Sequence, residues 1–430
     1  MLGAFANAFR TPDLRRKLLF VLLIIVIFRM GSQIPAPGVN VANVQTCIAA
    51  TKNEGLYSLI NLFSGGALLK LTIFALGIMP YITASIILQL LVVVIPRLET
   101  LKNEGQAGQA KITQYTRYLT LALAILQATG IVALARSGQL LRGCQDSLLY
   151  KPDSLMTMLV LVITMTAGTA VIMWLGELIT DRGIGNGMSI LIFTQVVATF
   201  PGSLWAVKVG RGWWVFGLVT LIGLVLIAAV IFMEQGQRRI PVQYARRMVG
   251  RKMFGGSSTY IPLKVNQAGV IPVIFASSLL YLPAMAAQFS GNSGWAAWVS
   301  TYLVKGDHPL YMAAYFALII FFTYFYVSIT FNPTEVADNM KKYGGFIPGI
   351  RAGKPTEEYL NYVLTRITLP GSLYLGLISL VPLVALVLVN ANQNFPFGGT
   401  SILIMVGVAL DTVKQIESQL QQRNYEGFLR

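Results

Sequence analysis

The chain has 430 residues, of which 55% are hydrophobic and only 12% are charged, and its formal net charge is +16. A typical soluble domain carries about 25% charged residues, so this composition excludes a set of ordinary soluble domains. Apolar runs of about 20 residues recur along the chain, and each is long enough to cross a bilayer as a helix. The alternating strands of about 10 residues that a membrane β-barrel needs do not occur. The sequence therefore predicts an all-α polytopic membrane protein.

Ten spans are predicted in chain order. They cover residues 18–34, 72–95, 117–136, 155–178, 187–207, 213–233, 266–288, 309–331, 367–389 and 399–416. The first span follows a basic segment but shows no small-residue cleavage site, so we interpret it as a retained helix and not as a signal peptide. With the N-terminus inside, 24 of the 33 Lys and Arg residues fall on the cytoplasmic side and 9 on the outer side. The positive-inside rule therefore predicts that both termini are cytoplasmic.

Two long basic loops, 234–265 and 332–366, are predicted on the cytoplasmic side. The first holds seven basic residues against one acid. Such a charge cluster would attract phosphate or an acidic protein surface. It is equally the ordinary basic charge that lies beside anionic lipid headgroups. The size of the loops favours a partner that docks on this face, while the charge alone leaves both readings open.

The residues that metal sites, nucleophilic enzymes and nucleotide sites need are scarce. His308 is the one histidine of the chain and lies in a predicted outer loop, so it supplies neither a metal cluster nor a paired nucleophile. The segment from Gly349 to Thr356 has the wrong glycine spacing for a phosphate loop, and Pro355 stands where Ser or Thr should bind Mg²⁺. The sequence predicts no catalytic residue, metal or cofactor, so an energy source must belong to another protein.

The spans carry no charged residue at mid-membrane depth. Ion-coupled transporters keep such charges as functional sites, so a secondary transporter is disfavoured, although backbone carbonyls at broken helices could replace them. The two cysteines, Cys47 and Cys144, fall in the first and second predicted outer loops. They form either a disulfide in an oxidising compartment or two free thiols.

A short internal repeat suggests an inverted architecture. Gly77 to Ile82 and Gly269 to Ile274 both read G-x-x-P-x-I, and they open the second and seventh predicted spans. An offset of five spans makes the two helices cross in opposite directions, as in an inverted repeat of five plus five. A chance match within Gly- and Ile-rich helices is the alternative.

A short apolar segment precedes the second span. Leu56, Leu59, Ile60 and Phe63 have helical spacing, and Gly65 and Gly66 then break the pattern. The segment is too short to cross the bilayer. It is either an interfacial helix or a re-entrant segment buried in a protein-lined cavity.

Eight ordered motifs resemble the SecY family, the channel subunits of bacterial preprotein translocases. They run from Asn61 to Ala67, Phe74 to Ile82, Asp181 to Gly187, Gly236 to Arg239, Pro262 to Asn266, Phe331 to Pro333, Phe346 to Arg351 and Gly398 to Ser401. The resemblance covers nearly the whole chain. It implies ten transmembrane helices in two pseudo-symmetric inverted halves, 1–207 and 208–430, around a central hourglass pore.

The resemblance also implies a protein-conducting channel with a ring of aliphatic side chains at its narrowest point. Carried over motif by motif, the ring is Ile82, Ile86, Ile192, Ile274 and Ile404. A narrow apolar constriction can exclude ions by dewetting, and aliphatic side chains can part around a polypeptide. A single isoleucine in a span is more often lipid-facing or core, so the assignment depends on the family pattern.

Segment 56–69 matches the plug of the family, which favours the re-entrant reading. The implied plug residues are Leu56, Leu59, Ile60, Asn61, Phe63, Ser64, Gly65 and Gly66. The implied lateral gate, through which signal sequences and nascent membrane helices leave, places Gln89, Gln127 and Asn266 near its seam. Hydrogen bonds between helices, with no role in gating, are the alternative for these three.

The implied partners are SecE, SecG, the SecA ATPase, the ribosome with a contact to its RNA, and signal sequences and unfolded preproteins, with anionic lipids around the chain. The implied docking residues for SecA and the ribosome are Arg238, Arg239, Arg246, Arg247, Arg251, Lys252 and Arg351. The expected location is the cytoplasmic membrane of a bacterium, with no enzymatic activity in this chain.

Overall fold

A computed structural model describes residues 11–50, 66–68, 70–136, 147–150, 154–244, 247–249, 252–254, 258–289, 294–304, 308–389 and 399–426. The chain divides into two compact units. The first unit comprises Met1–Phe216, Asn390–Pro396 and Val408–Arg430, and the second comprises Gly217–Val389 and Phe397–Gly407. The predicted halves, 1–207 and 208–430, are defined by their pseudo-symmetry. The division into two compact units does not test that symmetry, so the halves stay a prediction.

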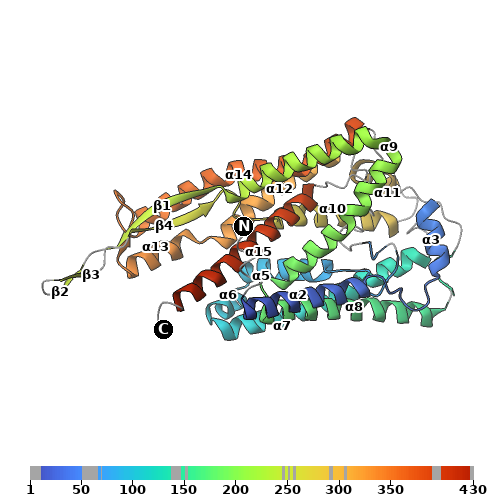
Figure 1. Ribbon diagram of the computed structural model, residues 1–430, viewed down its shortest axis with the longest axis horizontal. Helices are drawn as coiled ribbons and strands as arrows, with labels where there is room; N and C mark the ends of the chain where they lie inside the picture. The colour runs from blue at the N-terminus through green and yellow to red at the C-terminus, as the bar shows by residue number, and fades with distance from the viewer. Residues whose placement is uncertain are drawn as a thin grey trace. The chain divides into compact units, whose positions relative to one another are not determined.

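Helices make up the first unit (Figure 1). They are α2 (Pro12–Gly31), α3 (Val41–Ala50), α5 (Met79–Val94), α6 (Pro96–Asn103), α7 (Gln106–Arg136), α8 (Leu155–Arg182), the first part of α9 (Gly187–Gln235) and the end of α15 (Gly399–Glu426). The helix α9 is broken at Gly212, whose φ of 83° and ψ of 178° are not helical. The two parts of α9 are therefore two helices, which correspond to the fifth and sixth predicted spans.

The second unit combines helices with a small sheet (Figure 1). Its helices are the second part of α9, α10 (Ile271–Phe289), α11 (Gly294–Val299) with a π-helical turn at Ser300–Val304, α12 (Pro309–Thr330), α13 (Pro333–Lys342), α14 (Lys354–Val389) and the start of α15. Its strands are β1 (Gln237–Tyr244), β2 (Arg247–Val249), β3 (Lys252–Phe254), β4 (Ser258–Lys264) and β5 (Gly345–Phe346).

Each of the ten predicted spans overlaps a helix. Within the described residues, five helices are long and apolar enough to cross a membrane alone, and they start at Gln106, Leu155, Gly212, Pro309 and Lys354. The pair α5 and α6 qualifies together, with a bend of 100° between its members. The bend lies at Ile95, whose backbone is extended because Pro96 follows it.

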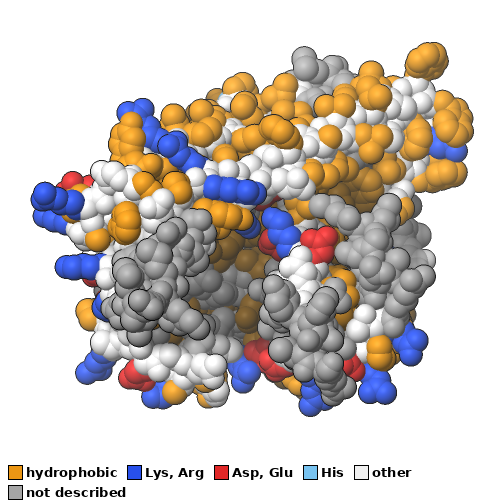
Figure 2. Space-filling model, turned by 60° about the vertical axis from the view of Figure 1, so that its left-hand side comes forward, with side chains coloured by type: hydrophobic (Ala, Val, Ile, Leu, Met, Phe, Trp, Pro, Cys, Tyr) orange, Lys and Arg blue, Asp and Glu red, His pale blue; other side chains and the backbone are white. Residues whose placement is uncertain are grey.

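Apolar side chains cover the outside of the second part of α9. Leu221, Leu224 and Phe232 are 65%, 61% and 78% exposed. Figure 2 shows hydrophobic side chains gathered in a broad patch over the upper part of its view. In water such a surface would be unfavourable, so these side chains are suited to contact with lipid tails.

A substructure of the first unit joins the predicted first and second outer loops, and we name it the outer substructure after that prediction. The backbone N–H of Asn40 donates to the carbonyl oxygen of Leu148 (2.9 Å), and that of Tyr150 donates to Gly38 (3.1 Å). The Asn43 side-chain amide donates to the carbonyl oxygen of Ser147 (2.9 Å). These bonds connect the two loops across a sequence separation of about a hundred residues.

Cys47 lies in the core of this outer substructure. It is fully buried, with an exposed fraction of 0%, and it is disulfide-bonded. The one other cysteine of the chain is Cys144, which lies outside the described residues. Of the two alternatives for the cysteines, the structure therefore favours a disulfide over free thiols.

The two predicted cytoplasmic loops form one ordered platform in the second unit. Strand β1 pairs antiparallel with β4 on one side and with β5 on the other, in the order β4-β1-β5. Ile240 and Val242 alternate with exposed residues along β1. Their buried side chains pack with Met340 of α13 and Leu360 of α14. The two segments predicted as cytoplasmic loops are therefore joined in one folded substructure, because the apolar alternation of β1 provides a face that both segments cover.

Candidate pore, gate and docking residues

Ile82 and Ile192 pack against the same apolar cluster of the first unit. Ile82 lies in the first turns of α5, and Ile192 lies in the first turns of α9. Both side chains are half-buried against a core that includes Ile78 and Leu191. Ile86 lies one turn beyond Ile82 and is buried. Three of the five predicted ring residues thus belong to the first unit, and the structure brings two of them to one cluster.

The remaining two ring residues belong to the second unit. Ile274 lies on α10 and Ile404 on α15, and their exposed fractions are 6% and 1%. The predicted ring therefore draws on both units, and its closure stays a prediction.

A glycine-rich turn fixes the start of α9 close to α8. The backbone N–H of Gly187 donates to the Thr180 hydroxyl (2.9 Å). A Cβ atom at Gly187 would lie 1.9 Å from the carbonyl oxygen of Gly176. Only glycine permits this approach, so the turn sets the position from which Ile192 extends.

The segments that carry Ile82 and Ile274 have matching hydrogen bonds. The N–H groups of Tyr81 and Ile82 both donate to the carbonyl oxygen of Ile78, at 3.0 and 3.1 Å. The N–H groups of Val273 and Ile274 both donate to Val270, at 3.2 Å each. The G-x-x-P-x-I repeat is therefore a repeat of local structure as well as of sequence.

The three predicted gate residues have different environments. Gln89 is exposed on α5, and Gln127 is half-buried on α7, which packs against α5. Asn266 is buried in the second unit, with an exposed fraction of 4%. Its side-chain amide donates to the Glu234 carboxylate (2.5 Å) and to the carbonyl oxygen of Gly269 (3.2 Å). Asn266 therefore ties the end of α9 to the segment before α10, which supports a structural role in this conformation.

Most of the predicted plug lies outside the described residues. Leu56, Leu59, Ile60, Asn61, Phe63, Ser64 and Gly65 belong to the undescribed segment 51–65. Gly66 is described, and its φ of 86° places it in a turn. The plug stays a prediction.

The predicted docking residues are distributed over the platform. Arg238 and Arg239 are exposed on β1, opposite Leu263 and Pro262 of β4. The Arg239 guanidinium lies 4.9 Å from the centre of the Tyr260 ring, a cation–π contact that orients it. Arg247 lies on β2 and Lys252 on β3, which pair with each other in a separate two-stranded sheet, while Arg246 and Arg251 lie outside the described residues.

Arg351 joins the same platform through β5. Strand β5 pairs with β1 at Gln243 and Tyr244, and Arg351 is exposed in the turn between β5 and α14. Its carbonyl oxygen accepts a hydrogen bond from the Thr356 hydroxyl (2.8 Å), which fixes this turn to the start of α14. Basic residues from the two predicted loops therefore lie on the same platform.

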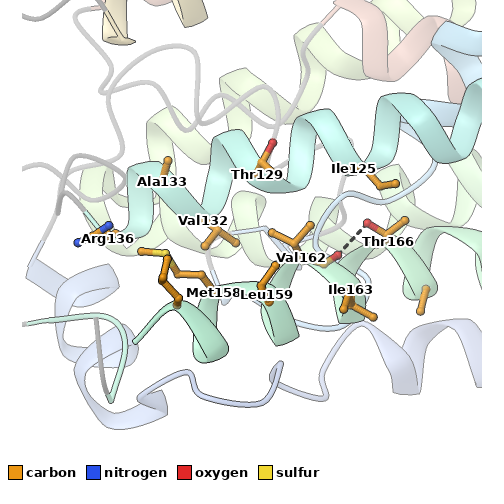
Figure 3. A pocket seen from close by; sticks show the side chains of 12 residues that line it. Ile125, Thr129, Val132, Ala133, Arg136, Met158, Leu159, Val162, Ile163 and Thr166 are labelled. Carbon is orange, nitrogen blue, oxygen red and sulfur yellow. Dashed lines mark hydrogen bonds between the residues drawn. The ribbon is translucent and has the colours of Figure 1, made fainter. Parts of the chain in front are cut away.

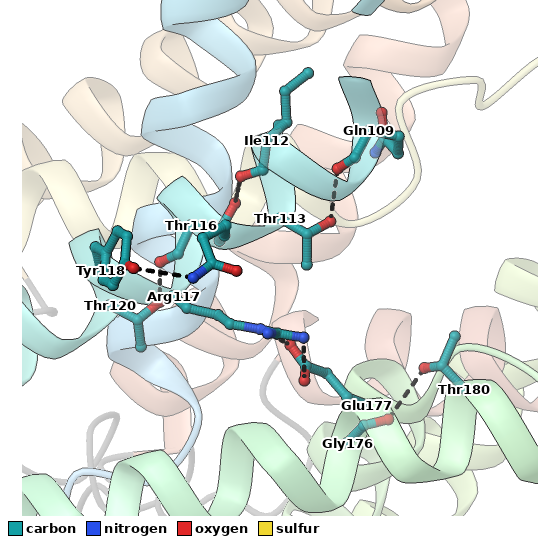
Figure 4. A network of polar contacts seen from close by, with 11 residues as sticks. Gln109, Ile112, Thr113, Thr116, Arg117, Tyr118, Thr120, Gly176, Glu177 and Thr180 are labelled. Carbon is teal, nitrogen blue, oxygen red and sulfur yellow. Dashed lines mark hydrogen bonds and ion pairs between the residues drawn. The ribbon is translucent and has the colours of Figure 1, made fainter. Parts of the chain in front are cut away.

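An ion pair between α7 and α8 was missed by the sequence analysis. The Arg117 guanidinium donates two hydrogen bonds to the Glu177 carboxylate, from Nε to Oε1 and from Nη2 to Oε2, both 2.9 Å (Figure 4). The signal for it was that both residues lie at the predicted cytoplasmic ends of consecutive antiparallel spans. Among the described residues, no group of three or more His, Cys, Asp or Glu side chains could hold a metal ion.

Known proteins resemble this chain along its whole length. A family model described as SecY matches residues 72–413. The chain is 71% identical over 437 residues to the protein translocase subunit SecY of Streptomyces galbus, with 100% of each chain covered. It is 62% identical over 442 residues to the protein translocase subunit SecY of Mycobacterium tuberculosis, again with 100% of each covered.

Two solved structures share the fold. One is described as the structure of a protein conducting channel, with a TM-score of 0.61, 20% identity, and 94% of this chain and 91% of that chain covered. The other is the idle yeast Ssh1 complex bound to the yeast 80S ribosome, with a TM-score of 0.62, 16% identity, and 93% and 88% covered. At these identities, the likeness concerns the fold alone.

Proposed function

The chain belongs to the SecY family, and we propose that it is the protein-conducting channel subunit of a bacterial translocase, not an enzyme. It translocates unfolded preproteins across the cytoplasmic membrane and releases membrane segments sideways into lipid. The observation that carries this proposal is the 71% identity, over the full length of both chains, to a protein translocase subunit SecY.

The seal of the channel is the ring of Ile82, Ile86, Ile192, Ile274 and Ile404. An apolar constriction excludes ions by dewetting, and flexible aliphatic side chains part when a polypeptide passes. The matched hydrogen bonds at Ile82 and Ile274 support this assignment, because equivalent helix starts give the two side chains equivalent positions on their helices. Segment 56–69 is the plug that closes the outer side at rest.

The lateral gate sorts segments by their hydrophobicity. An apolar segment partitions into lipid, whereas a polar one stays in the aqueous path, because insertion energies range from roughly −0.5 to +3.5 kcal/mol per residue. Gln89 and Gln127 lie on the packed pair α5 and α7, where they could offer hydrogen bonds to a segment that leaves. Asn266, in the second unit, holds the segment before α10 through its hydrogen bonds to Glu234 and Gly269.

The platform of β1, β4, β5 and α13 is the docking surface for the partners that drive transport. Its exposed Arg238, Arg239 and Arg351 suit the acidic or phosphate-bearing surfaces of the SecA ATPase and the ribosome, including ribosomal RNA. The yeast Ssh1 complex, which shares the fold, is bound to the yeast 80S ribosome, and by analogy the ribosome is one such partner of this chain. SecE and SecG are the membrane partners, anionic lipids surround the chain, and both termini are cytoplasmic.

Site-specific crosslinking tests the channel. A photoreactive amino acid is placed at Ile82 or Ile274, and a secretory substrate is stalled during translocation. The matched control is Leu221, which is 65% exposed on the apolar surface of α9. We expect substrate adducts at Ile82 and Ile274 and none at Leu221. Absence of adducts at both ring positions while the substrate is being exported would contradict the proposal.

A further inference from the structure

Several hydroxyl groups in the helices of this chain bond the backbone of their own helix. The Thr166 hydroxyl of α8 donates to the carbonyl oxygen of Val162 (2.7 Å; Figure 3). On α14, the Ser372 hydroxyl donates to the carbonyl oxygen of Leu369 (2.9 Å). A Ser or Thr hydroxyl reaches its own helix because it is attached to the Cβ atom. A tyrosine hydroxyl lies at the far end of a ring, so its partner must come from elsewhere.

The hydroxyl of Tyr374 on α14 is buried in the second unit. The residue has an exposed fraction of 8%, and its hydroxyl oxygen has no hydrogen-bond partner among the described residues. The carboxylate of Glu234, at the end of α9, is close enough to act electrostatically on this hydroxyl. A buried hydroxyl that stays unpaired destabilises a fold, so native proteins rarely keep one.

The side-chain oxygen of Asn266 is a second buried atom of this kind. Asn266 is 4% exposed, and its Oδ1 accepts no hydrogen bond from the described residues. Its Nδ2 donates to the Glu234 carboxylate (2.5 Å) and to the carbonyl oxygen of Gly269 (3.2 Å), which uses both hydrogens. Turning the amide over would place Oδ1 against two acceptor oxygens, so these bonds fix its orientation. The Oδ1 atom therefore needs a donor from outside these contacts.

Helix α14 approaches Asn266 closely at Gly371. A Cβ atom at Gly371 would lie 2.3 Å from the carbonyl oxygen of Val265 and 3.9 Å from the Cα atom of Asn266. Tyr374 follows Gly371 by three residues and therefore lies on the same face of α14. Glu234, Asn266 and Tyr374 all belong to the second unit, and we call these three residues the polar junction. It connects the end of α9, the segment before α10, and α14.

The groups of the polar junction complement a water molecule. Tyr374 has an O–H donor, and Asn266 Oδ1 and the Glu234 carboxylate are acceptors. A water both donates and accepts, and a buried water typically makes about three hydrogen bonds to polar groups that would otherwise be unpaired. A cation such as Ca²⁺ fits less well, because it takes about six to eight oxygen ligands.

We propose that the polar junction is the binding site of one structural water, which accepts from the Tyr374 hydroxyl and donates to Asn266 Oδ1 and to the Glu234 carboxylate. The water joins α14 to the end of α9 and to the segment that leads into α10. The site is independent of the proposed transport function, because none of its three side chains belongs to the ring or to the docking platform.

Radiolytic footprinting of the purified full chain in nanodiscs tests the site. A short X-ray pulse converts bound water into hydroxyl radicals, which oxidise a buried side chain beside that water, and mass spectrometry locates the oxidised residue. We expect oxidation of Tyr374. The matched control is Tyr315, which is similarly buried on α12 (5% exposed), and it should stay unoxidised. Equal oxidation of the two tyrosines, or none at Tyr374, would overturn the proposal.

Removal of the Tyr374 hydroxyl has effects of opposite sign for a hydrated and for a dry junction. If a water pairs with the hydroxyl, Tyr374→Phe loses a hydrogen bond and should lower the thermal unfolding midpoint by about 2–4 °C. In a dry junction the same substitution removes an unfavourable buried polar atom, so an unchanged or higher midpoint would count against the water. Tyr362→Phe, on an exposed position of the same helix (61%), is the control and should leave the midpoint unchanged. Tyr374→Phe adds no atom, so the variant is expected to fold.

A high-resolution density map distinguishes water from a cation as the occupant. A water should give an isolated peak within about 3.2 Å of both Tyr374 Oη and Asn266 Oδ1. A peak at about 2.3–2.6 Å from these oxygens would indicate a cation such as Ca²⁺ and would exclude the water. A map that shows buried waters elsewhere in the second unit but no peak at the polar junction would exclude it too.

Discussion

Gly77 and Gly269 adopt the same left-handed backbone conformation, with φ angles of 60° and 61°. Each lies two residues before a helix whose second residue is proline, since α5 begins at Met79 and α10 at Ile271. This conformation is easy for glycine and strained for residues with a Cβ atom. The helices that carry the predicted ring residues Ile82 and Ile274 therefore start with the same backbone conformation.

Replacing Gly269 should destabilise the fold through the backbone alone. A Cβ atom at Gly269 would meet no atom within 4 Å, so Gly269→Ala adds strain of about 1–2 kcal/mol without a steric clash. Gly217→Ala is the matched control, because Gly217 is also open but lies in helical backbone on α9. Thermal unfolding in detergent should show a lower midpoint for Gly269→Ala only. Equal midpoints would mean that the left-handed turn is not required.

The ion pair of Arg117 and Glu177 should couple α7 to α8. Its side chains are 43% and 22% exposed, so solvent screens the attraction, and a coupling of about 0.5–1 kcal/mol is expected even with two-fold hydrogen bonding. A double-mutant cycle of Arg117→Met and Glu177→Gln, followed by thermal unfolding, measures it. Additive effects of the two substitutions would show that the pair contributes nothing. Arg182→Gln controls for loss of an exposed charge on the same helix.

The sequence predicted the helices better than their connections. Each predicted span overlaps a helix, because the bilayer forces an apolar stretch to satisfy its own backbone as a helix. The break at Ile95 could be read from Pro96. The pairing of β1 with β5 joins Tyr244 to Gly345. No local pattern encodes a partner so far away in the sequence, and the polar platform therefore looked like two loops.

In the candidate site, too, the sequence predicted the features that depend on local geometry and missed those that depend on contacts between helices. The G-x-x-P-x-I repeat marked Ile82 and Ile274 because glycine and proline impose local geometry that the sequence displays. The contact between Arg117 and Glu177 depends on how two antiparallel helices align. The periodicity of apolar residues within either helix carries no information about that alignment. The one signal in the sequence was that both residues lie at the predicted cytoplasmic ends of their spans.

Reduction of the disulfide at Cys47 should destabilise the outer substructure. Cys47 is fully buried there, and closure of a long loop contributes about 2–4 kcal/mol. Thiol labelling in denaturant should require prior reductant, and dithiothreitol should lower the unfolding midpoint of the parent chain but not of a Cys47→Ser/Cys144→Ser variant. Labelling that is unchanged by reductant would contradict the bond.

Deletion of residues 56–66 should make the resting channel leak ions. If this segment is the plug, its loss leaves only the apolar ring as a seal, and a ring alone dewets and rewets intermittently. Planar-bilayer recordings should show resting conductance that the parent chain lacks, while export is reduced but not abolished. Unchanged resting conductance would contradict the plug assignment. Replacing the same residues with a Gly/Ser segment of equal length controls for loop shortening.

Charge reversal at Arg351 should impair transport without unfolding the platform. The Thr356 hydroxyl bonds the backbone carbonyl oxygen of Arg351 and not its side chain, so Arg351→Glu keeps the turn, and a surface substitution of this kind costs within about 0.5 kcal/mol. Opposite an acidic partner, however, like charges cost several kcal/mol, so SecA-driven export should fall at least about tenfold. Lys341→Glu, an equal charge change on exposed α13, should reduce export far less. Normal export by Arg351→Glu, or an equal loss in both variants, would show that docking does not depend on this turn.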